Sequence, residues 1–91
     1  MDRETAIELL EEHHDFPGAF VFRVIVDPVA LQPVEEALTG VIGQKPTARN
    51  ESWSRTRKYC SLRLTYTVQS ADEVLDGYAQ MDSIDGVRVQ L

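Results

Sequence analysis

Apolar and polar residues alternate with a period of two in two long stretches of the chain. In residues 19–26 every even position is apolar. In residues 59–68 the even positions are again apolar, and the odd positions from 61 to 67 are polar. This alternation is typical of strands with one buried face. Residues 45–54 carry a weaker extended pattern, and in residues 87–91 three apolar residues alternate with Arg88 and Gln90. We therefore expect four strands, the second of them at an edge of the sheet.

Three other stretches repeat their apolar residues at intervals of three and four, which indicates amphipathic helices. They are residues 3–13, residues 31–42 and a segment that begins after Ser70. Gly43 suits the left-handed conformation that ends a helix, so we place the end of the second helix there. Ser70 and Glu73 have the spacing of a capping box, which predicts the start of the third helix.

Without the first helix, the order is strand, helix, strand, strand, helix, strand. This order predicts an α+β domain with the ferredoxin-like α/β plait (βαββαβ), a four-stranded antiparallel sheet in the order 4-1-3-2 with two helices. Each of these helices has a single apolar stripe, so both should cover the same face and leave the other face open. The sequence thus predicts one domain over residues 16–91 and an N-terminal helical extension over residues 1–15.

The phase of the strands places three arginines on the open face. Arg23, Arg63 and Arg88 fall on adjacent strands, near the middle of each, and Val21 and Ile25 share that face. Two interpretations stay open. The arginines can spread their apolar stems over Val21 and Ile25 with their charged heads in water, or the face binds another subunit, another protein or an anion.

The charge is unevenly distributed along the chain. The total is −6, yet the segment from Gln44 to Arg63 has six basic residues against one acid, a net of +5. Its turn carries Arg55, Arg57 and Lys58, which form either a solvated loop or a contact for an acidic partner or a phosphate. Because the rest of the chain is strongly acidic and the centre of the open face lacks aromatic residues, we do not expect nucleic acid to bind.

The sequence offers little reactive chemistry. Cys60 falls in the buried phase of its strand, and the adjacent His13 and His14 diverge by about 100° on a helix, so they cannot chelate one ion. No glycine-rich phosphate loop is present. We therefore expect no catalytic residues, no cofactor and no metal. The single cysteine, the acidic start of the chain and the lack of a long apolar run favour a cytoplasmic protein that does not cross a membrane.

Three stretches resemble the YbeD-like family of small bacterial proteins of unknown function. They are Phe16-Pro17-Gly18-Ala19-Phe20-Val21-Phe22-Arg23-Val24-Ile25, the segment from Ser54 to Tyr59-Cys60-Ser61, and Val74-Leu75-Asp76-Gly77-Tyr78 with Met81, Ile84-Asp85 and Val87-Arg88-Val89-Gln90-Leu91. The resemblance covers residues 16–91. It implies a plait like that of the ACT regulatory domains, which bind small ligands or pair side by side to control enzymes.

The chain departs from that family's pattern at two places. It has Val26 where the family usually has glycine after the first strand, and residues 55–58 lack the family's turn glycine. The first departure argues against an amino-acid site of the ACT type. Our leading hypothesis is a non-catalytic regulatory or adaptor domain that acts by contact with another protein or with a second copy of itself. The alternative is an ACT-like sensor of an amino acid or another metabolite.

Overall fold

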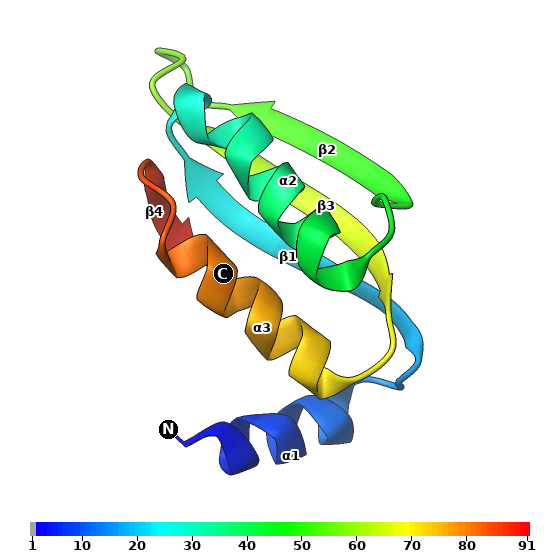
Figure 1. Ribbon diagram of the computed structural model, residues 1–91. Helices are drawn as coiled ribbons and strands as arrows, with labels where there is room; N and C mark the ends of the chain where they lie inside the picture. Colours follow the sequence, from blue (N-terminus) through cyan, green and yellow to red (C-terminus); the bar gives the residue numbers. More distant parts are fainter. Residues whose placement is uncertain (1) are drawn as a thin grey trace.

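The computed structural model describes residues 2–91 and has an α+β architecture, with three α-helices and one four-stranded antiparallel sheet (Figure 1). The elements in chain order are α1 (Arg3–His13), β1 (Gly18–Val26), the 3-10 helix η1 (Pro28–Ala30), α2 (Leu31–Ile42), β2 (Ala48–Trp53), β3 (Cys60–Val68), α3 (Ala71–Asp82) and β4 (Val87–Gln90). The strands lie in the order β2-β3-β1-β4. Figure 1 shows α2 and α3 together on one face of the sheet. The order of elements differs from the expected one by η1, a turn that the sequence pattern did not predict.

The core lies between the sheet and these two helices, where the period-two pattern places the apolar side chains. The even-numbered residues from Phe20 to Val26 and from Cys60 to Val68 are buried, and α2 and α3 cover them with their apolar stripes. The largest fully buried side chains are Tyr66, Phe22, Leu38, Leu62, Leu64 and Met81. The Tyr66 hydroxyl reaches the Thr39 hydroxyl at 2.9 Å, so the one polar atom of this ring is satisfied.

Local signals fix the ends of the helices. The Ser70 hydroxyl accepts a hydrogen bond from the backbone N–H of Glu73, and the Glu73 carboxylate accepts one from the N–H of Gln69. This confirms the predicted start of α3. Gly43 follows α2 with φ at 80°, as its predicted role requires.

Gly77 allows α3 to approach the sheet closely. A Cβ atom at this position would lie 2.9 Å from Cδ2 of Leu38 and 3.0 Å from Cε1 of Phe22, so no larger residue fits without a shift of the core. The helical spacing of apolar residues that predicted α3 does not mark this position. Glycine carries no hydrophobic signal, although the structure buries it.

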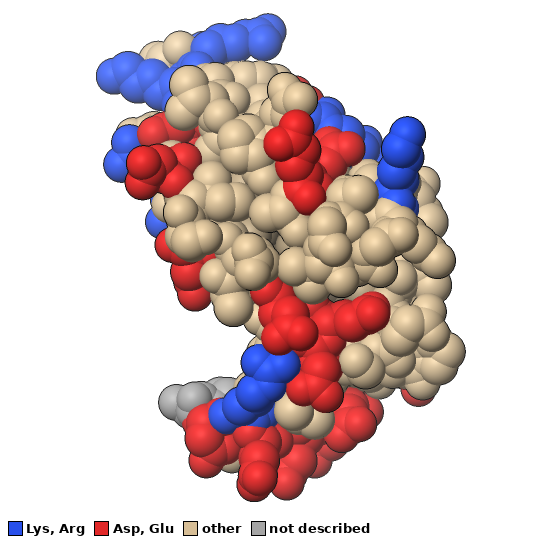
Figure 2. Space-filling view, viewed as in Figure 1, with Lys and Arg blue, Asp and Glu red and all other residues tan. Residues whose placement is uncertain are grey.

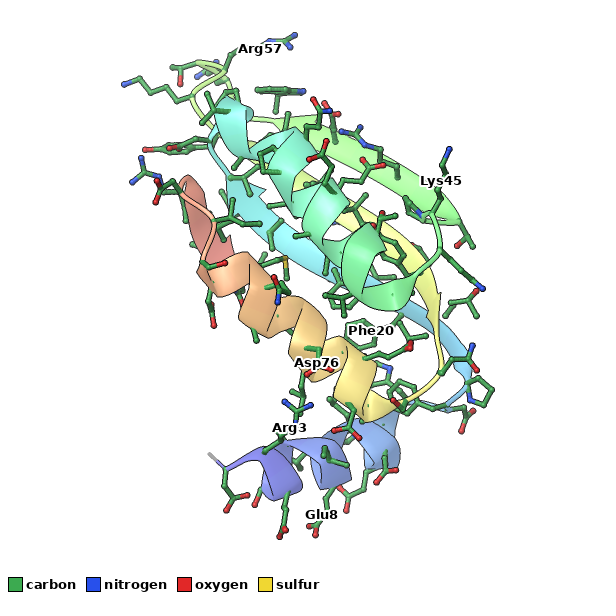
Figure 3. All side chains as sticks on the ribbon, in the orientation of Figure 1. Arg3, Glu8, Phe20, Lys45, Arg57 and Asp76 are labelled. Carbon is green, nitrogen blue, oxygen red and sulfur yellow. The ribbon has the colours of Figure 1, made fainter. Side chains whose placement is uncertain are left out.

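Helix α1 packs against α3, and none of its residues is fully buried. Arg3 forms ion pairs with Asp72 at 3.0 Å and with Asp76 at 2.9 Å, and Figure 3 shows it reaching from α1 toward Asp76. Both carboxylates are exposed on the surface of α3. They connect the N-terminal helix to the domain.

Strand β4 contains a bulge that the sequence pattern did not predict. Val87 is opposite Val26 but Val89 is opposite Ile25, so Arg88 is an extra residue between two paired positions. Val89 consequently lies on the same face as Ile25 and is exposed, whereas Gln90 lies on the helix side and donates to Asp82. The sequence pattern placed Arg88 on the open face, which would put Val89 on the helix side, and the bulge reverses this phase.

Candidate functional site

The two central strands place Arg23 and Arg63 directly opposite each other on the open face of the sheet. Both side chains are exposed, and within residues 2–91 neither guanidinium forms an ion pair with a carboxylate. Like charges at directly opposed positions of an antiparallel pair destabilise it. The centre of the sheet therefore contains two like charges that repel each other, at the positions that the strand phases predicted.

The surroundings of this pair contain no acid. The side chains that share its face on the four strands are neutral and small or apolar, and they are Ala19, Val21, Ile25, Ala48, Asn50, Ser52, Ser61, Thr65, Thr67 and Val89. Between Arg23, Arg63 and β2, the surface is hollowed to a volume of about 250 Å³. Val21 is 38% exposed and Val89 is 43% exposed, so the face offers apolar area next to its two charges. We refer to these ten residues with Arg23 and Arg63 as the open face.

Arg88 does not join the other two arginines at the centre of the sheet. It lies at the β4 bulge, where its Nε and Nη2 atoms each donate a 2.9 Å hydrogen bond to the Asp27 carboxylate. Its guanidinium also lies 6.0 Å from the centre of the Tyr59 ring. The expectation of three neighbouring arginines was wrong, because the extra residue of the bulge moves Arg88 to the end of the sheet.

The basic turn is a separate feature at the far end of the β2–β3 hairpin, and it carries Arg55, Arg57 and Lys58. All three are exposed, and within the described residues no ion pair holds them. Arg57 has a positive φ of 61° and its guanidinium lies 5.6 Å from the Trp53 ring. Figure 2 shows this basic end opposite the acidic surface of α1.

The groups with potential for chemistry lie apart from one another. Cys60 is fully buried in the core, and this burial raises the pKa of its thiol above the ordinary value. Over residues 2–91 no cluster of His, Cys, Asp and Glu has the geometry to hold a metal ion. None of the helices in this part of the chain has the length and apolar character needed to cross a membrane. The open face therefore offers binding by charge and apolar contact.

The sequence was compared with protein families, curated proteins and solved structures. The model of a family described as "Protein of unknown function (DUF493)", which is the YbeD family, matches residues 11–91. The chain belongs to this family. The match confirms the resemblance noted in the sequence, and it begins inside α1, earlier than the resemblance did. No curated protein and no solved structure matches the chain.

Proposed function

We propose that this member of the DUF493 family is a non-catalytic regulatory or adaptor domain of the cytoplasm that binds another protein through the open face. The single observation that carries the proposal is the Arg23–Arg63 pair. A partner that places carboxylates between these two guanidinium groups would remove the repulsion and form charge-assisted hydrogen bonds. The ferredoxin-like plait is part of the proposal, and the strand order β2-β3-β1-β4 with α2 and α3 on one face supports it.

Electrostatics favour an acidic protein surface over a polyanion as the partner. The open face is positive, but the whole chain carries −6, and the repulsion from a long nucleic acid would grow with its length. The exposed Val21 and Val89 also fit a protein interface, where apolar contacts and arginine side chains are both common.

The test compares two variants that change charge on different surfaces. Arg23→Glu with Arg63→Glu reverses the pair, and Lys45→Glu changes an exposed cation beside α2, away from the open face. Partners captured from lysate by the immobilised wild-type domain are identified, and one is purified for titration. We expect the reversed pair to lose binding, while Lys45→Glu keeps it. Equal affinity of a folded double variant for that partner would contradict the proposal.

A second candidate function is a metabolite sensor, and one cavity favours it. A groove of about 710 Å³ lies between α2 and β2, within the size range of small-molecule sites. Its walls carry both signs of charge. Arg49 and Glu35 pair with each other at 2.7 Å, which leaves Lys45 and Glu36 to meet the two charges of a zwitterion such as an amino acid. Thermal unfolding with each of the twenty amino acids tests this function, since a bound ligand raises the midpoint. Unchanged midpoints at millimolar concentrations would rule out this site for amino acids.

A further inference from the structure

One edge of β1 is only partly covered by its neighbouring strand. β1 has nine residues and pairs with β3 along its whole length, but β4 pairs with Val24–Val26 alone. The N-terminal half of β1 therefore has a free edge on the β4 side. A free edge is a template for another strand, and natural proteins usually block it.

The hydrogen bonds fix which backbone groups face this edge. The N–H of Leu91 donates to the carbonyl of Arg23 at 2.8 Å, so the backbone of Arg23 faces the β4 side. Backbone groups alternate in direction along a strand. Ala19 and Val21 thus also direct their N–H and C=O groups to the β4 side, beyond the end of β4, while Phe20 and Phe22 direct theirs to β3.

A groove runs along this free edge, and aromatic side chains form its floor. It has a volume of about 420 Å³ and lies between His14, Phe20, Tyr78 and Leu91, with Val21 and Arg23 on the strand itself. The rings of His14 and Phe20 pack edge to face at 5.0 Å, and Figure 3 shows Phe20 between α3 and the sheet. An apolar hollow of about 290 Å³ between α1 and α3 adjoins the groove at His14 and Tyr78. The walls therefore suit apolar side chains.

The charge of the groove specifies the occupant further. Arg23 lies at one end of the groove. Within residues 2–91 it forms no ion pair, and no Asp or Glu side chain lines the groove. Arg23 is also close enough to Tyr78 for its positive charge to oppose the rise in the Tyr78 pKa that burial causes. A bound carboxylate would face this cation across the edge.

We infer that the groove receives an extended peptide segment of a partner protein, which adds to β1 as a strand and places a carboxylate against Arg23. The free edge from Ala19 to Phe22 is four residues long, about 13 Å at the rise of a strand, which is room for about four extended residues beside it. Side chains of an added strand alternate between the two faces of the sheet. The peptide side chains on the helix side contact Phe20 and Tyr78 and are apolar. The peptide side chain opposite Val21 points to the open face, lies diagonal to Arg23 and is acidic.

This inference rests on the proposed role of Arg23 in docking, but it adds a contact that the open face alone would not require. The probe is a pool of capped hexapeptides in which apolar residues alternate with Glu, and the matched pool has Lys in place of Glu. Binding is followed by amide hydrogen exchange of the full chain. We expect the Glu pool to slow exchange at Ala19 and Val21, which are fast without peptide, and the Lys pool to leave both fast.

Three variants decide between the two modes of binding. Val21→Pro removes one outward N–H and no bond to β3, so it should weaken peptide binding about tenfold without unfolding the domain. Arg23→Gln should weaken it by a similar factor, and only for peptides that contain Glu. Arg63→Gln, on the neighbouring strand, should have no effect. Binding that needs Arg63 and tolerates Val21→Pro would overturn strand addition while supporting the open face as the docking site.

Two further outcomes would also overturn the inference. One is slow exchange at Ala19 and Val21 in the free protein together with a doubled native mass, which would identify a second copy of the chain as the occupant. The other is the absence of any protection by the Glu pool in a domain whose core amides exchange slowly, which would show that the groove does not accept extended peptides.

Discussion

Arg88 donates two hydrogen bonds of 2.9 Å to the carboxylate of Asp27, and this pair connects the bulge of β4 to the end of β1. The same connection carries a backbone bond of 2.7 Å from the Asp27 N–H to the Gly86 carbonyl. Two-point contact between guanidinium and carboxylate fixes direction as well as distance. The pair therefore anchors the short last strand in its register.

The Asp27–Arg88 pair should contribute measurably to stability despite its exposure. Asp27→Ala and Arg88→Ala should each lower the free energy of unfolding by a small amount, because the Arg88 side chain is more than half exposed and solvent screens the pair. Urea denaturation of both single variants and the double variant measures the coupling. Additive losses would show that the two side chains do not stabilise each other.

This pair also shows where prediction from the sequence failed. A period-two pattern in β1 and β3 predicted their buried and exposed faces, because over nine residues one phase buries all the large apolar side chains at even positions. Strand β4 has only four residues, and one inserted residue reverses the phase of those that follow it. Arg88 was thus assigned to the wrong place, while Arg23 and Arg63 were assigned correctly. The free edge of β1 exists because only three of its residues pair with β4, and the pattern of apolar residues does not show how many residues will pair.

The contact of Gly77 with the core predicts opposite effects at two helical glycines. Gly77→Ala should destabilise the domain by about 1–3 kcal/mol, since its Cβ would overlap Leu38 and press on Phe22. Gly40→Ala is the matched control, because no atom lies within 4 Å of its added Cβ and alanine favours the helix by up to about 1 kcal/mol. Thermal midpoints should move down for the first and up for the second. A stable Gly77→Ala variant would contradict the close approach of α3.

The left-handed backbone at Arg57 should cost the hairpin some stability. Both Arg57→Gly and Arg57→Ala remove the cation that lies over Trp53, so their difference isolates the backbone. At a φ of 61° the glycine variant should be more stable by about 1 kcal/mol. Guanidinium denaturation followed by Trp53 fluorescence measures it. Equal midpoints would place residue 57 in an ordinary right-handed conformation.

Burial should protect the Cys60 thiol from reagents. The side chain has no exposed surface, and its raised pKa keeps the thiolate population low at neutral pH. A disulfide reagent should label the folded chain far more slowly than the chain in 6 M guanidinium, which serves as the positive control. Labelling of the folded chain at the rate of the unfolded one would contradict the packing of β3 against the helices.

Glu51 should make the stability depend on pH in the acidic range. Its carboxylate accepts hydrogen bonds from Arg49 and from the Trp53 indole, and the bond from Arg49 is the main cause of a pKa below the ordinary value of 4.5. A carboxyl group whose pKa is lower in the folded state stabilises the fold above the unfolded value and loses this contribution as the pH falls through the folded value. The advantage of the wild type over Glu51→Gln should therefore be constant above pH 4.5 and shrink below it. Glu8→Gln, on the outer surface of α1, is the control and should differ little from the wild type over the same range. An advantage over Glu51→Gln that stays constant down to pH 2 would show that ionised Glu51 is not held by Arg49.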